Sequence, residues 1–152
     1  QGWLKKGPVV LSFCRGGWCP FCNKQLSSSA AHYDECRKRG AELVAISPET
    51  PDQAADTQAK DKIPFVILSD ANNAVAGKFG LVFSVSPEVK RLYLEMGIDL
   101  EKSQGNADWK LPVPATYVVR QDGRIAYAFV DVDYRKRASE EDLWKALDDL
   151  KK

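Results

Sequence analysis

Residues 9–26 constrain the fold most, because a short apolar stretch leads through two glycines into a Cys-x-x-Cys pair. Pro20, inside the pair, suits the first position of a helix, where its missing N–H has no partner. Cys19 is then expected at the N-cap and Cys22 at the third helical position. A helix start stabilises a thiolate through its free backbone N–H groups and the positive end of its dipole. The segment therefore predicts an activated dithiol of the kind that redox enzymes use.

The charge around this pair favours an anionic sulfur. The first 33 residues contain four Lys or Arg side chains and no acidic one. One of the four, Arg15, is expected at the surface, and it is also the best candidate for steadying a thiolate or a peroxide. Trp18 directly precedes Cys19 and is expected to contact a partner. A Cys19–Cys22 disulfide is feasible, because three helical steps rise about 4.5 Å and bridged Cα atoms usually lie about 4.4 to 6.8 Å apart.

Composition sets the bounds around this pair. The 152 residues are 44% hydrophobic, so one domain over residues 1–152 can bury a core without disulfide staples. The net charge is +1 and the longest basic run is 135–137, so nothing indicates nucleic-acid binding. That run is expected to be a solvated lead-in to a helix. No apolar stretch is near 18 residues and none resembles the h-region of a secretory signal, so neither a membrane span nor export is expected from these residues. The chain starts at Gln1, so an upstream address could have been removed, and a cytoplasmic location is the expectation.

Strand and helix signals alternate along the chain. Strands are expected at 7–13, 42–46, 65–68, 116–120 and 125–130, and helices at 20–39, 51–62, 73–79, 87–96 and from residue 139 onward. Gly40 follows three basic residues and is expected just past the end of the first helix. An Asp-Gly turn joins the last two strands as an antiparallel hairpin. This order predicts an α/β fold with a mixed central sheet and helices on both faces.

Five blocks of the sequence carry a family resemblance. They are Gly-Pro-Val-Val-Leu-Ser-Phe at 7–13, Val-Ala-Ile-Ser-Pro-Glu-Thr at 44–50, Pro-Phe-Val-Ile-Leu-Ser-Asp at 64–70, Lys-Phe-Gly-Leu at 78–81 and Pro-Ala-Thr-Tyr-Val-Val at 114–119. Together they resemble the alkyl hydroperoxide reductase/thiol-specific antioxidant (AhpC/TSA) family, peroxiredoxin-like proteins on the thioredoxin fold. The resemblance implies a thioredoxin-like three-layer α/β/α sandwich over nearly the whole chain, with the family's usual N-terminal hairpin trimmed.

The resemblance also implies an activity. Such a protein would be a thiol peroxidase that reduces hydrogen peroxide or small organic hydroperoxides without a cofactor. A thioredoxin- or glutathione-type donor would restore its thiols, and an oligomer is possible.

The departures from the family pattern concern the site itself. The family's Pro-x-x-x-Thr-x-x-Cys loop matches residues 15–22, which puts Cys22 at the peroxide-attacking position, Cys19 at the threonine and Arg15 at the proline. The family arginine that pairs with the thiolate corresponds to Pro114. That proline instead resembles the cis-proline that faces the cysteines in thioredoxins. The resemblance thus implies a peroxiredoxin body that carries a thioredoxin-like dithiol.

These departures leave alternatives open. The family match makes Cys22 the peroxidatic thiol and Cys19 the resolving thiol, whereas the N-cap argument makes Cys19 the more acidic one. A thiol-disulfide oxidoreductase would instead use Cys19 to attack a protein disulfide, with Trp18 and Pro114 framing the partner. A non-enzymatic redox sensor would use the dithiol only as a switch.

The remaining cysteines and the single histidine support no other site. Cys14 and Cys36 are expected in the core, although the spacing of the four cysteines matches a plant-type iron–sulfur site. On one continuous helix Cys36 would lie about 21 Å beyond Cys22, too far for one cluster or zinc ion, so no metal is expected. His32 is expected at the surface or in a groove, some three turns from Cys19, which argues against a Cys-His hydrolase.

Overall fold

The computed structural model describes residues 2–152. Its strands are β1 (Val9–Phe13), β2 (Glu42–Ser47), β3 (Val66–Ser69), β4 (Val82–Ser84), β5 (Lys110–Pro112), β6 (Ala115–Val119) and β7 (Ile125–Val130). Its helices are α1 (Pro20–Ala31), α2 (Tyr33–Lys38), α3 (Pro51–Lys60), the 3₁₀ turn η1 (Ala71–Asn73), α4 (Ala74–Lys78), α5 (Pro87–Glu95), α6 (Leu100–Gln104) and α7 (Glu140–Asp149).

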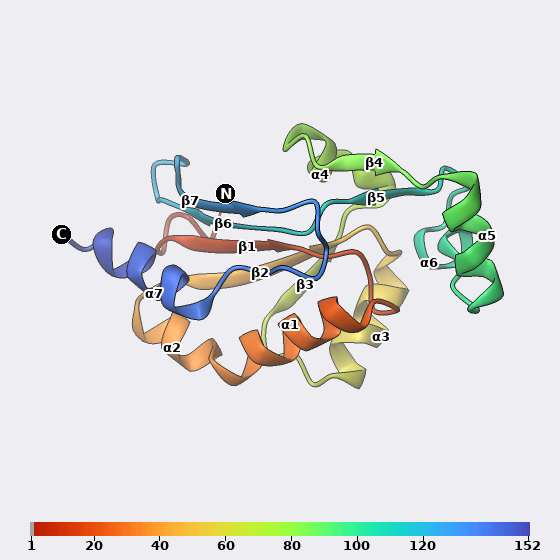
Figure 1. Cartoon of the computed structure of the whole chain (residues 1–152). Coiled ribbons are helices and arrows are strands. Elements are labelled where there is room, and N and C mark those ends of the chain that lie inside the picture. Colours follow the sequence, from red (N-terminus) through yellow and green to blue (C-terminus); the bar gives the residue numbers. More distant parts are fainter. Residues whose placement is uncertain (1) are drawn as a thin grey trace.

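A five-stranded mixed sheet forms the centre of the molecule in the order β3-β2-β1-β6-β7. Strand β1 pairs in parallel with β2 and antiparallel with β6, and β6 forms the expected hairpin with β7. Figure 1 shows α1, α2 and α3 on one side of this sheet and α4 with the β4-β5 ribbon on the other. The predicted α/β class with a mixed sheet and helices on both faces is confirmed.

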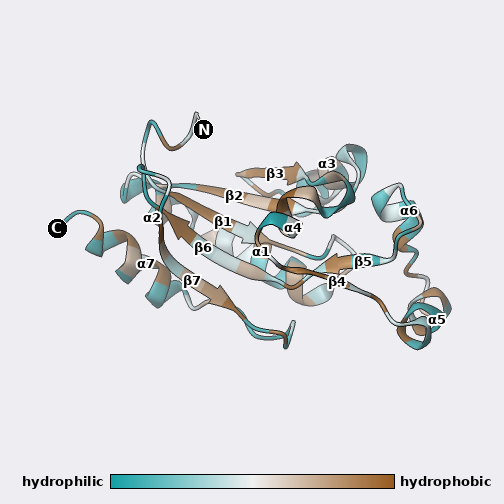
Figure 2. Cartoon of the chain, turned by 90° about the horizontal axis from the view of Figure 1, so that it is seen from above, coloured by the Kyte–Doolittle hydropathy of each residue, from teal (hydrophilic) through white to brown (hydrophobic). Residues whose placement is uncertain are grey.

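Two apolar cores fill the two faces of the sheet. Alternate residues of β1 point to opposite sides, so Val10 joins the core under α1, α2, α3 and α7, while Phe13 joins the core under α4. Figure 2 shows the apolar colouring concentrated along the strands and mixed with polar residues on the outer helices. Among residues 2–152, no helix is both long enough and apolar enough to cross a membrane. The dithiol follows β1, the strand at the middle of the sheet.

The first long helix differs from its prediction. The segment expected as one helix over 20–39 breaks at His32, where φ is −110° and ψ is 12°, so Cys36 lies on a second helix. The prediction that Cys36 and Cys22 lie on one continuous helix was therefore wrong, and so was the axial distance derived from it. Cys36 nevertheless belongs to a different core cluster from Cys22. Gly40 ends this segment with a φ of +76°, as predicted. The short elements β4, β5 and α6 were not predicted.

Candidate active site

The loop between β1 and α1 is held in place by two glycines. Gly16 has a φ of +142°, a conformation that L side chains rarely adopt, and a Cβ there would lie 2.6 Å from Trp18 Nε1. Gly17 packs against α3 so closely that a Cβ would lie 2.2 Å from Thr57 Oγ1. The Gly17 N–H donates to Glu49 Oε1 at 2.9 Å. These contacts fix the direction in which the chain enters α1.

The dithiol occupies the start of α1 as the sequence predicted, with Cys19 at the N-cap and Pro20 in the first turn. Both thiols are free and only 1% exposed. The pKa of Cys19 is lowered from 9.0 to about 5, chiefly because the Cys22 thiol donates to it. Backbone N–H groups of Cys22 and Phe21 and the charge of Arg15 act in the same direction. The same hydrogen bond and burial raise the pKa of Cys22. The pair therefore holds a single negative charge that the two sulfurs share through one proton.

Arg15 lies inside the site and not at the surface. Its side chain is 4% exposed, so the prediction of a surface charge was wrong. The guanidinium lies 5.0 Å from the Trp18 ring and 4.5 Å from the Tyr134 ring, and it donates to the Tyr93 hydroxyl. Cation–π contacts explain how this charge is buried with no acidic partner among residues 2–152. The backbone N–H of Arg15 also donates to Cys22 Sγ at 3.3 Å.

A second arginine reaches the dithiol from the far end of the sequence. Arg137 Nη2 donates to Cys22 Sγ at 3.4 Å. The prediction that run 135–137 is a solvated lead-in was wrong for this residue, and no sequence signal separated it from its basic neighbours. The resemblance predicts Pro114 at the position of the family's arginine, and here Arg137 brings a guanidinium to the Cys22 sulfur from a different segment. Its Nε and Nη1 are buried and have no hydrogen-bond partner within the described chain.

The turn after β7 carries Arg137 into the site. Asp131 and Asp133 accept backbone N–H groups two residues ahead at 2.9 and 3.1 Å, and Asp133 also pairs with the Arg135 side chain at 2.8 Å. Tyr134, between Asp133 and Arg135 in the sequence, packs edge-on against Phe21 of α1 with ring centroids 5.5 Å apart. The sequence showed a turn here but no role for it. The structure shows that the turn closes over α1.

The Val113–Pro114 bond is trans. No cis peptide bond occurs in residues 2–152, so the expected thioredoxin-like cis-proline is corrected. Trans is the preferred form of an X-Pro bond, and only about one in twenty is cis in folded proteins. Pro114 is buried and directly precedes β6, whose first residue, Ala115, pairs with Phe13 of β1. Its predicted role in framing a partner stays a prediction.

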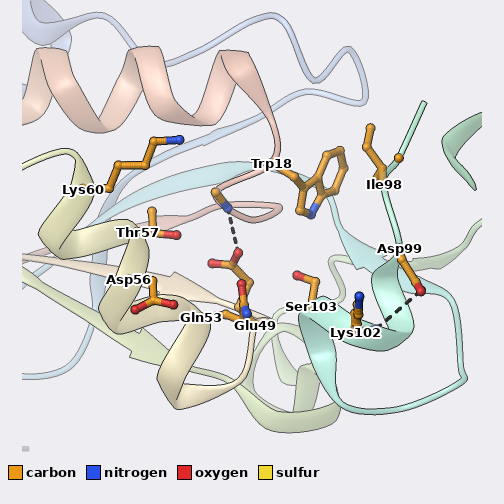
Figure 3. Close-up of a pocket in the computed structure, with 12 residues that line it drawn as sticks. Trp18, Glu49, Gln53, Asp56, Thr57, Lys60, Ile98, Asp99, Lys102 and Ser103 are labelled. Atoms are coloured by element: carbon orange, nitrogen blue, oxygen red, sulfur yellow. Dashed lines mark hydrogen bonds between the residues drawn. The ribbon is translucent and has the colours of Figure 1, made fainter.

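Trp18 borders a cavity of about 420 Å³ that lies between the β1-α1 loop, α3 and α6. Figure 3 shows Trp18, Glu49 and Ser103 around this space. Glu49 is 3% exposed and accepts from Gly17 N–H and, at 2.9 Å, from the Ser47 hydroxyl. Trp18 Nε1 and Ser103 Oγ are buried without a partner among residues 2–152. Glu49 belongs to the Val-Ala-Ile-Ser-Pro-Glu-Thr block at 44–50, but nothing in the sequence pointed to its place beside the dithiol loop.

The other cysteines and the histidine lie where the sequence predicted. Cys14 is buried beside the dithiol and donates to the Ile46 carbonyl at 3.4 Å, and burial raises its pKa to about 12. Cys36 is buried under the sheet, which raises its pKa to about 11. His32 lies at the surface with Nδ1 2.9 Å from Glu140. Within residues 2–152, no group of three His, Cys, Asp or Glu side chains is placed to hold a metal ion.

Known proteins resemble the chain in sequence. A sequence model described as the AhpC/TSA family matches residues 3–128. Chloroplastic peroxiredoxin Q of Sedum lineare is 35% identical over 78 residues, which cover 51% of this chain and 42% of that protein. Chloroplastic peroxiredoxin Q of Triticum aestivum is 38% identical over 81 residues, which cover 51% and 36%. The matched region thus spans less than half of these curated relatives.

Solved structures resemble the chain over nearly its whole length. Peroxidoxin BcpB from Mycobacterium tuberculosis superposes with a TM-score of 0.73 at 20% identity, covering 98% of this chain and 83% of that one. Peroxiredoxin Q of Xanthomonas campestris gives 0.73 at 15% identity, covering 97% and 81%. These likenesses show the thioredoxin-like fold of peroxiredoxins. Because the family match runs over most of the sequence, the chain belongs to the AhpC/TSA family.

Proposed function

We propose that the protein is a thiol peroxidase that reduces hydrogen peroxide or small organic hydroperoxides through a Cys19/Cys22 dithiol-disulfide cycle. The observation that carries this proposal is the Arg137 guanidinium, 3.4 Å from Cys22 Sγ in a dithiol that holds one negative charge. A cation beside the sulfur stabilises the thiolate, and its free donors can polarise a peroxide oxygen. Membership of the AhpC/TSA family supports the same reaction.

In the proposed reaction Cys22 attacks first. The shared proton moves to Cys19, and the Cys22 thiolate attacks one peroxide oxygen while the O–O bond breaks. The electron pair leaves with the other oxygen, which takes the proton from Cys19 and departs as water or an alcohol. Cys22 is then a sulfenic acid, and Cys19 is a thiolate one helical turn away.

Resolution follows at the same helix start. The Cys19 thiolate attacks the Cys22 sulfur, and the sulfenic hydroxyl leaves as hydroxide, which solvent protonates to water. The Cys19–Cys22 disulfide is then the two-electron oxidised form of the pair. One dithiol of the thioredoxin type, or two monothiols of the glutathione type, reduces it back to the two thiols. Trp18 and its cavity are the proposed approach for that donor. A cytoplasmic site of action stays a prediction, since the curated relatives named above are chloroplastic.

A second candidate function rests on the acidity of Cys19. A thiol with a pKa of about 5 at a helix N-cap is also suited to attack protein disulfides, with Cys22 resolving the mixed disulfide. Burial of both sulfurs to 1% exposure argues against it, because a protein disulfide must reach the attacking sulfur directly. A non-enzymatic redox sensor would use the same Cys19/Cys22 dithiol as a switch, without catalytic turnover.

The thiol variants test the proposal. We expect Cys22→Ser to abolish peroxide turnover, and Cys19→Ser to form a dimedone-trappable sulfenic acid at Cys22 that does not become a disulfide. Stopped-flow tryptophan fluorescence after mixing with peroxide gives the rates, since Trp18 adjoins the pair. Peptide mapping of the oxidised wild type should find a Cys19–Cys22 disulfide with Cys14 and Cys36 free.

Three outcomes would count against the proposal or its order of attack. A sulfenic acid trapped only at Cys19, in Cys22→Ser, would reverse the roles of the two thiols. Insulin reduction without peroxide consumption would favour the thiol-disulfide oxidoreductase. If the protein neither consumes peroxide nor reduces insulin, the non-enzymatic redox sensor is the hypothesis that remains. Cys36→Ser is the matched control, because that thiol is buried in a separate core and should not affect the rate.

A further inference from the structure

The polar cavity beside the dithiol loop carries charges that the described residues do not neutralise. It is the space of about 420 Å³ next to Trp18, between the β1-α1 loop, α3 and α6. Its volume falls in the range of small-molecule sites, about 300 to 1,000 Å³. Figure 3 shows Asp56 and Glu49 on the side of α3, and Trp18, Ser103 and Lys102 on the side of α6. The first group supplies acceptors and the second supplies donors.

The acceptor side holds a buried carboxylate with no cation beside it. Glu49 is 3% exposed, and its two oxygens accept from neutral donors, the Gly17 N–H and the Ser47 hydroxyl, both at 2.9 Å. Among residues 2–152 it forms no ion pair, and neither does Asp56, which is exposed on α3 at the rim of the cavity. A buried anion is costly unless a cation pairs with it. This side of the cavity therefore favours a ligand with a positive charge.

The donor side has buried donors without acceptors. Trp18 Nε1 and Ser103 Oγ are both buried and have no hydrogen-bond partner within the described chain. Lys102, the neighbour of Ser103 on α6, is exposed and forms no ion pair there. Unpaired buried donors cost free energy unless a ligand supplies an acceptor. A carboxylate, with two acceptor oxygens and a negative charge, can satisfy an indole N–H, a hydroxyl and an ammonium together.

The two remaining charged side chains of the lining do not change this division. Asp99 is the N-cap of α6, and its Oδ1 already accepts the backbone N–H groups of Glu101 and Lys102 at 3.0 and 3.5 Å. Lys60 is exposed at the end of α3, where its long side chain can keep the ammonium in water. The cavity thus separates an acceptor side from a donor side.

We infer that this cavity binds a small zwitterion, an α-amino acid or a dipeptide with both ends free. Its ammonium group pairs with Glu49 and Asp56, and its carboxylate accepts from Trp18 Nε1, Ser103 Oγ and the Lys102 ammonium. Because Trp18 also packs against the dithiol, a bound ligand ties this cover of the sulfurs to α6. The binding goes beyond the proposed peroxidase reaction and does not depend on it.

The test follows the indole N–H signal of Trp18 by nitrogen–proton NMR during titration, with Trp18→Phe to assign that signal. The probes are glycylglycine, its N-acetyl derivative, which lacks the ammonium, and its amide, which lacks the carboxylate. Glycylglycine should shift the Trp18 signal to saturation. The N-acetyl derivative should bind about fivefold more weakly or worse, as for one lost ion pair. The amide should bind roughly tenfold more weakly or worse, because it leaves the donor side without a charged acceptor.

Two variants locate the two ends of the ligand. Ser103→Ala should weaken glycylglycine binding by roughly tenfold, and α6 stays attached because the Ser103 carbonyl still accepts from the Thr50 N–H at 2.9 Å. Asp56→Asn should weaken glycylglycine binding by about two- to fivefold and leave the N-acetyl derivative unaffected. Ser27→Ala and Asp122→Asn, at exposed positions that do not line the cavity, are the matched controls and should keep the wild-type affinity.

Several results would overturn the inference. A Trp18 signal that does not move to saturation would mean that the cavity holds no such ligand. Equal affinity for the three probes, or tighter binding of the N-acetyl derivative, would remove the ammonium site. Equal affinity of Ser103→Ala and Ser27→Ala would place the ligand elsewhere. A protein that binds glycylglycine as expected but consumes no peroxide would support this site and refute only the proposed function.

Discussion

At the scale of single residues, one proton between two sulfurs decides the chemistry. Cys19 is the acidic partner and Cys22 holds the proton, because the thiol of Cys22 donates to the thiolate of Cys19. Two guanidiniums flank the pair, and neither has an acidic partner among the described residues; Arg15 is buried, and Arg137 is half-buried with its Nε and Nη1 atoms buried. Arg15 is stacked between aromatic rings, and Arg137 touches Cys22 itself. The site therefore combines a retained negative charge with two cations fixed before any substrate arrives.

The lowered pKa of Cys19 predicts how reactivity depends on pH. Below pH 5 the pair carries both protons and is neutral; above it one proton is lost and the anion forms. The rate of reaction with hydrogen peroxide should therefore rise through about pH 5 and be level by about pH 7. Thiolate absorbance at about 240 nm should follow the same curve in wild type. A single rise near 9.0, the ordinary pKa of a cysteine thiol, would show that the hydrogen bond between the thiols does not form.

Arg137 predicts a specific loss of rate. A hydrogen bond to a charged group contributes about 1.5 to 3 kcal/mol, so Arg137→Gln should slow the peroxide reaction by roughly 10- to 150-fold. Arg137→Lys should restore part of the rate, because the charge returns without the planar fork. Arg124→Gln, at the exposed β6-β7 turn, is the matched control. A purely structural role would instead leave the rate intact and lower the midpoint of urea unfolding.

At the scale of elements, the sequence predicted the part of the site that is local. The glycine turn, the N-cap cysteine and the proline inside the pair define the start of α1 within a few residues of chain. The break at His32 escaped prediction because nothing in the residues on either side interrupts a helical pattern. Strands β4 and β5 are three residues each and pair across 25 intervening residues, so no local periodicity marks them. Arg137 was missed since its direction depends on where Tyr134 packs.

The contact between the β1-α1 loop and α3 predicts an effect on stability. A Cβ at Gly17 would lie 2.2 Å from Thr57 Oγ1, on a stiff β-branched side chain. Gly17→Ala should therefore destabilise the protein by about 1 to 3 kcal/mol, measured by urea unfolding. In a Thr57→Ala background the same substitution should cost less. Equal costs in the two backgrounds would place the strain elsewhere in the loop.

At the scale of the whole molecule, three segments far apart in the sequence meet at the dithiol. The β1-α1 loop and the first turn of α1 bring the two cysteines, α5 contributes Tyr93 against Trp18, and the β7-α7 connection contributes Tyr134 and Arg137. The sheet order explains this meeting, because β1 lies at its centre and ends among these segments. Composition and pattern predicted the sheet, but only the folded chain shows which side chains cover the sulfurs.

This convergence predicts that oxidation is felt at the other end of the chain. Oxidation removes the negative charge that the two sulfurs share, so Arg137 faces a neutral disulfide and its hydrogen bond to Cys22 Sγ weakens. Amide hydrogen exchange over residues 131–138 should become several-fold faster in the oxidised protein. The β6-β7 turn at residues 120–124, which does not contact the dithiol, is the internal reference. Equal exchange of residues 131–138 in both redox states would mean that Tyr134 alone holds the segment.

The near-complete burial of Cys19 and Cys22 makes molecular size a filter on their chemistry. A small electrophile such as iodoacetamide should modify the pair quickly at neutral pH, because the anion is present, whereas a maleimide bearing a large dye should react slowly. Labelling surveys that rely on bulky tags would then score as inert a thiol that is among the most nucleophilic in the molecule. Urea at concentrations that loosen the β7-α7 connection without unfolding the sheet should remove the difference between the two reagents.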